Sequence, residues 1–214
     1  MRLWHVSEQQ GIEVFEPRLP PSPGSGISSP VVWAVDEPRL PHYLVPRECP
    51  RVAFYALPST AAADLSRFFG AGTFRHVVAI ESAWFERARS TPLWLYEMPA
   101  QLFSCVDSNA GYHVSEQVVR PLSVHRVAEP LAQFGERSVE LRVVSNLWTL
   151  VEAVVGSSVA FSCIRMRNAL PPGAVPHNPS VAAEVGVDAD HGGHVSALGE
   201  RHAGGVEEAD ALEA

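Results

Sequence analysis

The sequence predicts a single α+β domain at residues 1–169, built on a mixed and mostly antiparallel sheet, followed by an acidic tail at 170–214. Hydrophobic residues make up 46% of the 214 positions, which is enough for a core. Short β-prone runs alternate with helix-patterned segments as far as Ala169. Beyond it the chain has no sustained periodicity and no Phe, Tyr or Trp, so burial cannot offset the entropy of ordering. We therefore expect a disordered tail, whose removal after Ala169 costs no stability.

The expected strands are short runs of β-branched and aromatic residues between turn-forming residues. They lie at residues 2–6, 31–35, 51–56, 76–80, 93–98, 112–115, 118–127, 139–144 and 159–165. Pro, Gly and Ser crowd residues 17–30, where neither a helix nor a strand ladder can persist, so this segment is expected to be a loop. A second turn-rich segment at 107–111 precedes the strand at 112–115.

About four helical segments are expected between these strands. Asp36 is placed to cap a short helical or turn segment through Tyr43. The others cover 61–69, 82–89 and 147–155, the last with apolar residues at i, i+3, i+4, i+7 and i+8.

Charge is divided unevenly along the chain. The first 168 residues hold 16 acidic and 15 basic side chains, a net charge of −1, whereas the remaining residues carry −7. A near-neutral body argues against non-specific nucleic-acid binding, which needs a surplus of positive charge. All basic residues are arginine, so a Schiff-base lysine and a P-loop lysine are both excluded.

The cysteines and the N-terminal residues bear on the cellular compartment. Cys49, Cys105 and Cys163 are odd in number and widely spaced, which disfavours a disulfide framework or a cysteine zinc site. The first residues turn polar too soon for a signal peptide, and no apolar stretch is long enough to span a membrane. We therefore expect a cytoplasmic protein without a membrane contact. No metal site is expected either, since the histidines at 191–194 lie in the tail.

Well-known catalytic signatures are absent, among them G-x-G-x-x-G, G-x-S-x-G and H-E-x-x-H. What remains is a set of His and aromatic residues on expected strands and turns. His5 lies on the first strand, Trp33 on the second, Tyr43 ten residues later, and acids occur within 107–116.

The runs that hold His5, Trp33 and Tyr43, with Leu95-Tyr96-Glu97-Met98-Pro99 and Tyr112-His113-Val114-Ser115-Glu116, resemble rifampin-type ADP-ribosyltransferases. This resemblance rests on about 20 positions within 1–45 and 93–127, and residues 46–90 have no counterpart in those enzymes. Through stretches such as Val77-Val78-Ala79-Ile80-Glu81-Ser82-Ala83-Trp84, residues 1–169 also resemble a bacterial family of uncharacterised proteins.

The transferase resemblance implies an ADP-ribosyltransferase-like fold that takes NAD, or a related nucleotide, as its substrate. His5 would orient the ligand, and Trp33, Tyr43 and Tyr112 would contact it. Asp107 or Glu116 would stabilise the oxocarbenium-like transition state, because departure of nicotinamide leaves positive charge on the ribose. The resemblance does not decide between these two acids.

Each of these residues also has a structural interpretation. His5 can be a hydrogen-bonded core histidine, Trp33 and Tyr43 can be core aromatics, and Asp107 can form an Asx turn. Two alternatives to an enzyme therefore stay open. One is a domain with the same fold that binds a small ligand without chemistry, and the other is a protein-interaction domain. Convergence of His5, Trp33, Tyr43 and one acid on a pocket would favour the enzyme.

Overall fold

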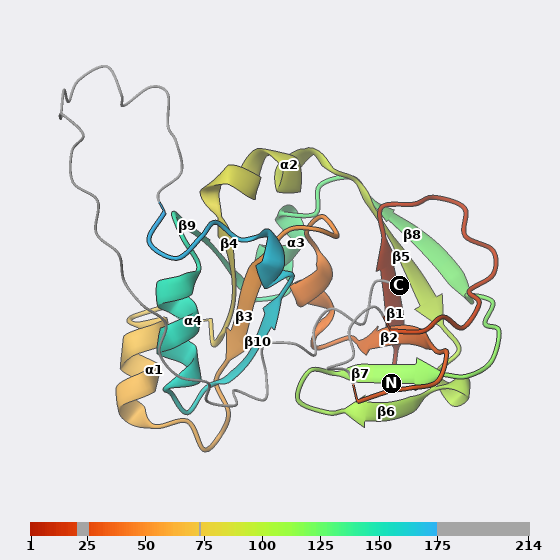
Figure 1. Ribbon diagram of the computed structural model, residues 1–214, viewed down its shortest axis with the longest axis horizontal. Coiled ribbons are helices and arrows are strands. Elements are labelled where there is room, and N and C mark those ends of the chain that lie inside the picture. Colours follow the sequence, from red (N-terminus) through yellow and green to blue (C-terminus); the bar gives the residue numbers. More distant parts are fainter. Residues whose placement is uncertain (21–25, 73, 175–214) are drawn as a thin grey trace.

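The computed structural model describes residues 1–20, 26–72 and 74–174, which form two facing β-sheets with helices on the outer side of one of them (Figure 1). Each sheet collects strands from distant parts of the chain. The order of the six-stranded sheet is β6-β7-β2-β1-β5-β8, and that of the four-stranded sheet is β10-β3-β4-β9.

All neighbouring strands of the six-stranded sheet are antiparallel. Its strands are β1 (Leu3–Ser7), β2 (Val32–Asp36), β5 (Leu93–Met98), β6 (Ser104–Asp107), β7 (Tyr112–Ser115) and β8 (Ser123–Val127). A residue of β1 and its partner on β5 share one face of the sheet, so the register His5↔Tyr96 places these two side chains on the same side.

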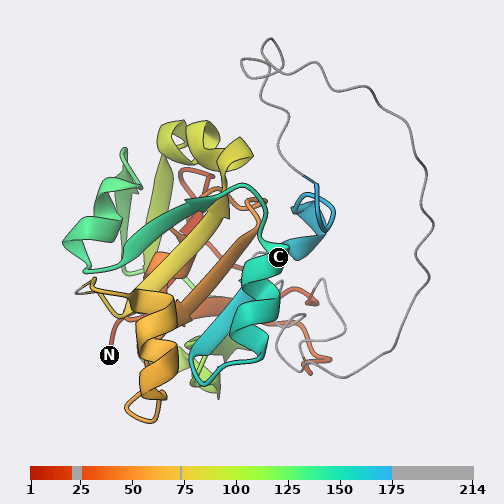
Figure 2. The same cartoon turned by 90° about the vertical axis from the view of Figure 1, so that its left-hand side faces the viewer.

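The four-stranded sheet contains the only parallel pair among the described strands, β4 with β9. Its strands are β3 (Arg51–Tyr55), β4 (His76–Glu81), β9 (Glu140–Val144) and β10 (Ala160–Ile164). Helices α1 (Ala62–Phe69) and α4 (Trp148–Val155) cover its outer face, as Figure 2 shows from that side. Helices α2 (Phe85–Ser90) and α3 (Ala132–Glu136) lie at the junction of the two sheets (Figure 1).

Three apolar clusters follow from this layering. The largest fills the space between the sheets, with Trp4, Trp33 and Tyr43 among its members. A second lies between the four-stranded sheet and helices α1 and α4. The third covers the outer face of the six-stranded sheet and includes Phe15 and Tyr96. Each sheet is therefore buried on both faces over its central strands.

The α+β class and the mostly antiparallel arrangement predicted from the sequence are confirmed. So is the turn after Asp36, whose Oδ1 accepts the Arg39 N–H at 2.9 Å ahead of the 3₁₀ helix Leu40–Tyr43. The expected strand at 118–127 is wrong in its first half, because Pro121 interrupts it and β8 begins only at Ser123.

One strand and one α-helix of the described residues were missed by the sequence prediction, besides two short 3₁₀ helices, Ala100–Leu102 and Met166–Asn168. Strand β6 is a short polar edge strand whose residues are exposed or half-buried, so it has no apolar alternation to reveal it. Helix α3 is barely one turn long and buries only Phe134. The expected helix at 82–89 begins as a 3₁₀ turn, Ser82–Trp84, before it continues as α2.

The body of the fold extends past Ala169. Leu170 donates its N–H to the buried Glu81 carboxylate at 3.1 Å and accepts the Trp148 indole N–H at 2.8 Å. Asn146 Nδ2 donates to the carbonyl oxygens of Pro171 and Ala174. The first residues assigned to the tail are thus hydrogen-bonded to the domain, while the rest of the expected tail, 175–214, lies outside the described residues. Of the helices within the described ranges, none has the length and hydropathy needed to cross a membrane.

Candidate functional site

A pocket of about 220 Å³ opens where β1 and β2 separate. The two strands pair only at Leu3↔Asp36 and Trp4↔Val35, although β1 continues beside β5 as far as Ser7. Beyond Trp4, β2 therefore diverges from β1. The His5 ring fills the start of the gap, and its Nδ1 lies 3.0 Å from the carbonyl oxygen of Trp33. A side chain thus replaces a hydrogen bond that the strand ladder no longer provides.

This contact fixes the protonation of His5. A carbonyl oxygen only accepts hydrogen bonds, so Nδ1 must carry the proton and the neutral ring leaves its lone pair on Nε2. Burial, together with the charges of Arg47 and Arg18, lowers the pKa of His5 to about 4. His5 as a whole is 8% exposed and lines the pocket, and its ring packs against Phe15 at a centroid distance of 4.7 Å. The pocket therefore contains a neutral imidazole with an accepting nitrogen.

The outer wall of the pocket is residues 8–18, a segment anchored at several points. The Tyr96 hydroxyl donates to Gln9 O at 2.8 Å and accepts the Ile12 N–H at 3.1 Å. Farther along, Phe15 pairs with Val119 and Arg18 pairs with Val31 through backbone hydrogen bonds. Because the wall is fixed at both ends and in the middle, the pocket is preformed.

Charged side chains of both signs line the pocket. Arg18 and Arg47 provide two guanidinium groups, and Glu8 and Glu16 provide two carboxylates. Glu8 already has protein partners, since its carboxylate accepts the backbone N–H of Arg47 at 2.7 Å and lies 3.8 Å from Arg87. Ile12, Val14 and Val31 are among the apolar residues of the same lining. The pocket thus combines an accepting imidazole, two cations and an apolar wall.

The aromatic side chains predicted to contact a nucleotide lie elsewhere. Trp33, Tyr43 and Tyr112 are each 3% exposed and belong to the cluster between the two sheets. The Tyr43 and Tyr112 hydroxyls are 2.6 Å apart, and the Trp33 ring meets Tyr112 edge to face. Trp4 faces the same cluster and precedes His5 on β1, so the His5 side chain lies on the opposite face. Trp33 therefore meets the His5 ring through its backbone carbonyl, and Tyr43 and Tyr112 do not line the pocket.

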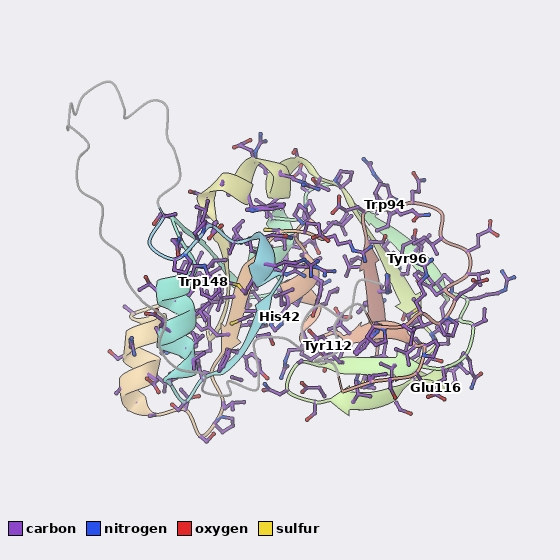
Figure 3. The ribbon with its side chains drawn as sticks, in the orientation of Figure 1. His42, Trp94, Tyr96, Tyr112, Glu116 and Trp148 are labelled. Carbon is purple, nitrogen blue, oxygen red and sulfur yellow. The ribbon has the colours of Figure 1, made fainter. Side chains whose placement is uncertain are left out.

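The two candidate acids are also separate from the pocket. Asp107 ends β6, and its Oδ1 accepts the N–H groups of Asn109 and Ala110 at 2.8 and 2.9 Å, an Asx-type turn. Glu116 is exposed after β7 and accepts a hydrogen bond from Ser29 at 3.0 Å. Figure 3 shows Glu116 at the periphery of the six-stranded sheet, away from Tyr112 and His42. Of the predicted site, the structure thus places the His5 ring and part of Trp33 at the pocket.

Sequence reasoning did not find Arg18, Arg47 or Phe15 as pocket residues. Each of the two arginines directly follows a proline, which indicates a loop position. Arg39 also follows a proline, so this signal does not single out the pocket arginines. Phe15 follows an apolar-spaced run near the Pro-rich loop. Among the described residues, no three metal-ligating side chains gather at one point.

Comparison with known families places the chain. A family model described as a family of unknown function, DUF6886, matches residues 4–169. The chain belongs to the DUF6886 family. No curated protein and no solved structure matches it significantly. The DUF6886 match includes the whole lining of the His5 pocket, from His5 to Leu93, but it brings no activity with it.

Proposed function

We propose that this domain binds a small organic ligand in the His5 pocket, where His5 Nε2 accepts a hydrogen bond from the ligand. The observation that carries this proposal is that the two ring nitrogens of His5 differ in their hydrogen bonding. Nδ1 is committed to Trp33 O, and no described residue bonds to Nε2, although the ring lines a preformed pocket. An accepting nitrogen without a protein partner in a pocket is a group that a ligand can satisfy.

The electrostatics favour binding over acid–base catalysis by His5. A general base is most effective when its pKa lies near the working pH, whereas the pKa of His5 is about 4. His5 is therefore neutral at pH 7 and a weak base, but a competent hydrogen-bond acceptor. This supports the version of the domain that binds a ligand without transforming it.

The volume limits the ligand to a small molecule. At about 220 Å³, the pocket is below the roughly 300–1,000 Å³ typical of sites for drug-sized ligands. A single ring with one or two substituents matches this volume, whereas a dinucleotide such as NAD would have to lie mostly outside it. ADP-ribosyl transfer gains no support from the site, because Tyr43 and Tyr112 are core residues and Asp107 and Glu116 lie apart from His5.

A fragment screen by ligand-observed NMR tests the proposal. Wild-type protein is compared with His5→Asn, whose amide can still donate to Trp33 O but lacks the Nε2 acceptor. His125→Asn is the matched control, because His125 is exposed on β8 and outside the pocket. We expect fragments that bind the wild type and the control but lose at least half of their signal with His5→Asn.

Absence of any bound fragment at millimolar concentration would refute the proposal, as would a set of fragments indifferent to His5→Asn. NAD and nicotinamide belong in the same screen. Release of nicotinamide from NAD would overturn the assignment of a non-catalytic site.

A further inference from the structure

The lining of the His5 pocket also specifies the chemical class of its ligand, an inference that rests on the proposed function. We infer that the ligand is a small carboxylate that also carries a hydroxyl or amino group, with the carboxylate held by Arg18 and Arg47 and the donor bound to His5 Nε2. Three parts of the lining bear on this, and each constrains a different part of the ligand.

The histidine end requires a donor. The Nδ1 proton is used by Trp33 O, so His5 offers only a lone pair to the pocket. A carboxylate or ether oxygen has no proton to give to it, whereas a hydroxyl or an amino group does. A cationic histidine would reject an ammonium group, but neutral His5 accepts one.

The arginine end requires an anion. Arg18 and Arg47 lie on two different segments that both line the pocket, and the charges of both lower the pKa of His5, so both act on the space beside its ring. Arg47 Nε also lies 4.0 Å from the Glu48 carboxylate, which makes Arg18 the principal anion-binding group. The Arg18 side chain is exposed and has no acid partner within the part of the chain that the structure describes. A planar guanidinium binds a carboxylate by two parallel hydrogen bonds, which makes such a group its natural partner.

The two acidic residues of the lining, Glu8 and Glu16, do not cancel the preference of the arginines for an anion. The Glu8 carboxylate accepts the backbone N–H of Arg47 and lies 3.8 Å from Arg87, so its charge is balanced in part by groups of the protein itself. Glu16 is exposed, and its charge opposes a doubly anionic ligand while it tolerates one carboxylate beside an amino or hydroxyl group. Ile12, Val14 and Phe15 also line the pocket and offer an apolar surface to a ring or short alkyl spacer.

Three compounds of one shape separate the two recognition elements. 4-Hydroxybenzoate carries both groups, benzoate lacks the donor, and 4-hydroxybenzamide lacks the charge. At pH 7.5 the carboxylate is ionised and the phenol keeps its proton. Isothermal titration with wild-type protein is expected to show 4-hydroxybenzoate bound about tenfold more tightly than either of the other two, since each comparison removes one hydrogen-bonding group from a partner that stays in place.

Two variants assign each preference to its residue. Arg18→Gln is expected to abolish the advantage over 4-hydroxybenzamide and to keep the advantage over benzoate, while His5→Asn is expected to do the reverse. Arg67→Gln, an exposed arginine on α1 at the opposite end of the molecule, is the control and should change neither ratio. Thermal melting confirms that each variant is folded.

The outcomes distinguish the inference from the proposal on which it rests. If other fragments bind in a His5-dependent way but the carboxylate has no advantage over the carboxamide, the ligand class is wrong and the binding function stands. Equal affinity ratios in wild type and Arg18→Gln would also overturn the role of Arg18. If nothing binds in either experiment, both ideas fail.

Discussion

Three buried or partly buried histidines, His5, His42 and His76, are expected to make this domain sensitive to mild acid. The pKa of His5 is lowered to about 4 by burial, and that of His76 to about 4 by burial and by the charge of Arg39. His42, whose Nε2 lies 2.7 Å from His76 Nε2, has its pKa lowered well below the usual value, again chiefly by burial. In the unfolded chain each of these rings titrates near pH 6.5. Between pH 6.5 and 4, therefore, the unfolded state binds more protons, and the free energy of unfolding falls as the pH falls.

The size of the effect follows from the pKa values of His5 and His76. At pH 5.0, a histidine with a pKa of about 4 when folded and about 6.5 when unfolded loses about 2 kcal/mol of stabilisation. His5 and His76 together account for about 4 kcal/mol, and His42 adds to this, against a total stability of about 5–15 kcal/mol for a typical domain. The contribution of these histidines to stability is expected to be fully present above pH 7 and largely lost by pH 5, before the carboxylates of Glu37 and Glu48, with their lowered pKa values, begin to protonate.

Urea unfolding monitored by Trp fluorescence at pH 7.5, 6.0 and 5.0 measures this dependence. His76→Gln removes one of the titrating rings and should make the slope of stability against pH shallower by up to about 1.4 kcal/mol per pH unit. His125→Gln, on the exposed strand β8, is the control. Equal unfolding free energies at pH 7.5 and 5.0 in the wild type would refute the reasoning, because they would mean that the histidines are not neutral and buried.

Three further predictions concern stability. A chain ending at Ala169 should be less stable to urea than one ending at Ala174 by about 1–3 kcal/mol, because the five extra residues hydrogen-bond the body; equal stabilities would contradict this. Gly111→Ala should lower the melting temperature, at a cost of about 1–3 kcal/mol in the free energy of unfolding. The reason is that the φ of Gly111 is +73° and that a Cβ would lie 2.5 Å from a carboxylate oxygen of Asp36. An unchanged melting temperature would show that the turn can relax. Tyr43→Phe should cost about 1 kcal/mol through the lost contact with the Tyr112 hydroxyl, and a double-mutant cycle with Tyr112→Phe that shows no coupling would refute that contact.

The fold was predictable where the signal is local. The runs around β3, β4 and β5 alternate or cluster apolar residues strongly enough to be recognised, and their bounds match the prediction to within one residue. The stripe of α4 likewise follows from its spacing. Elements without such a signal were missed, as β6 shows, because an exposed edge strand is specified by its partner β7 rather than by its own composition.

The division into two sheets was not predictable in the same way. Strand β3 follows β2 in sequence, yet it pairs with β10 and β4 in the other sheet. The sequences of β2 and β3 do not indicate which strands they pair with, since both strands are buried on two faces and consist of nearly continuous apolar runs. The pocket lies at the start of β2, because this strand pairs with β1 only at its last two residues, Val35 and Asp36, and diverges from β1 at Val32 and Trp33. Past Asp36 the chain turns through Leu40–Tyr43 and continues into the second sheet.

The site illustrates how register decides which residues meet. The period of a strand shows from sequence alone that Trp33 and Val35 share a face of β2, and that Trp4 and Val6 share a face of β1. Which face of β1 joins which face of β2 is set by the pairing Trp4↔Val35. A shift of one residue in that pairing would have put His5 and Trp33 on the same side of the sheet, where both could contact one nucleotide as predicted. The observed register instead buries Trp33 between the sheets and turns His5 toward Phe15. His5 therefore lines a pocket together with the loop arginines Arg18 and Arg47, whereas Tyr43 and Tyr112 lie outside the lining.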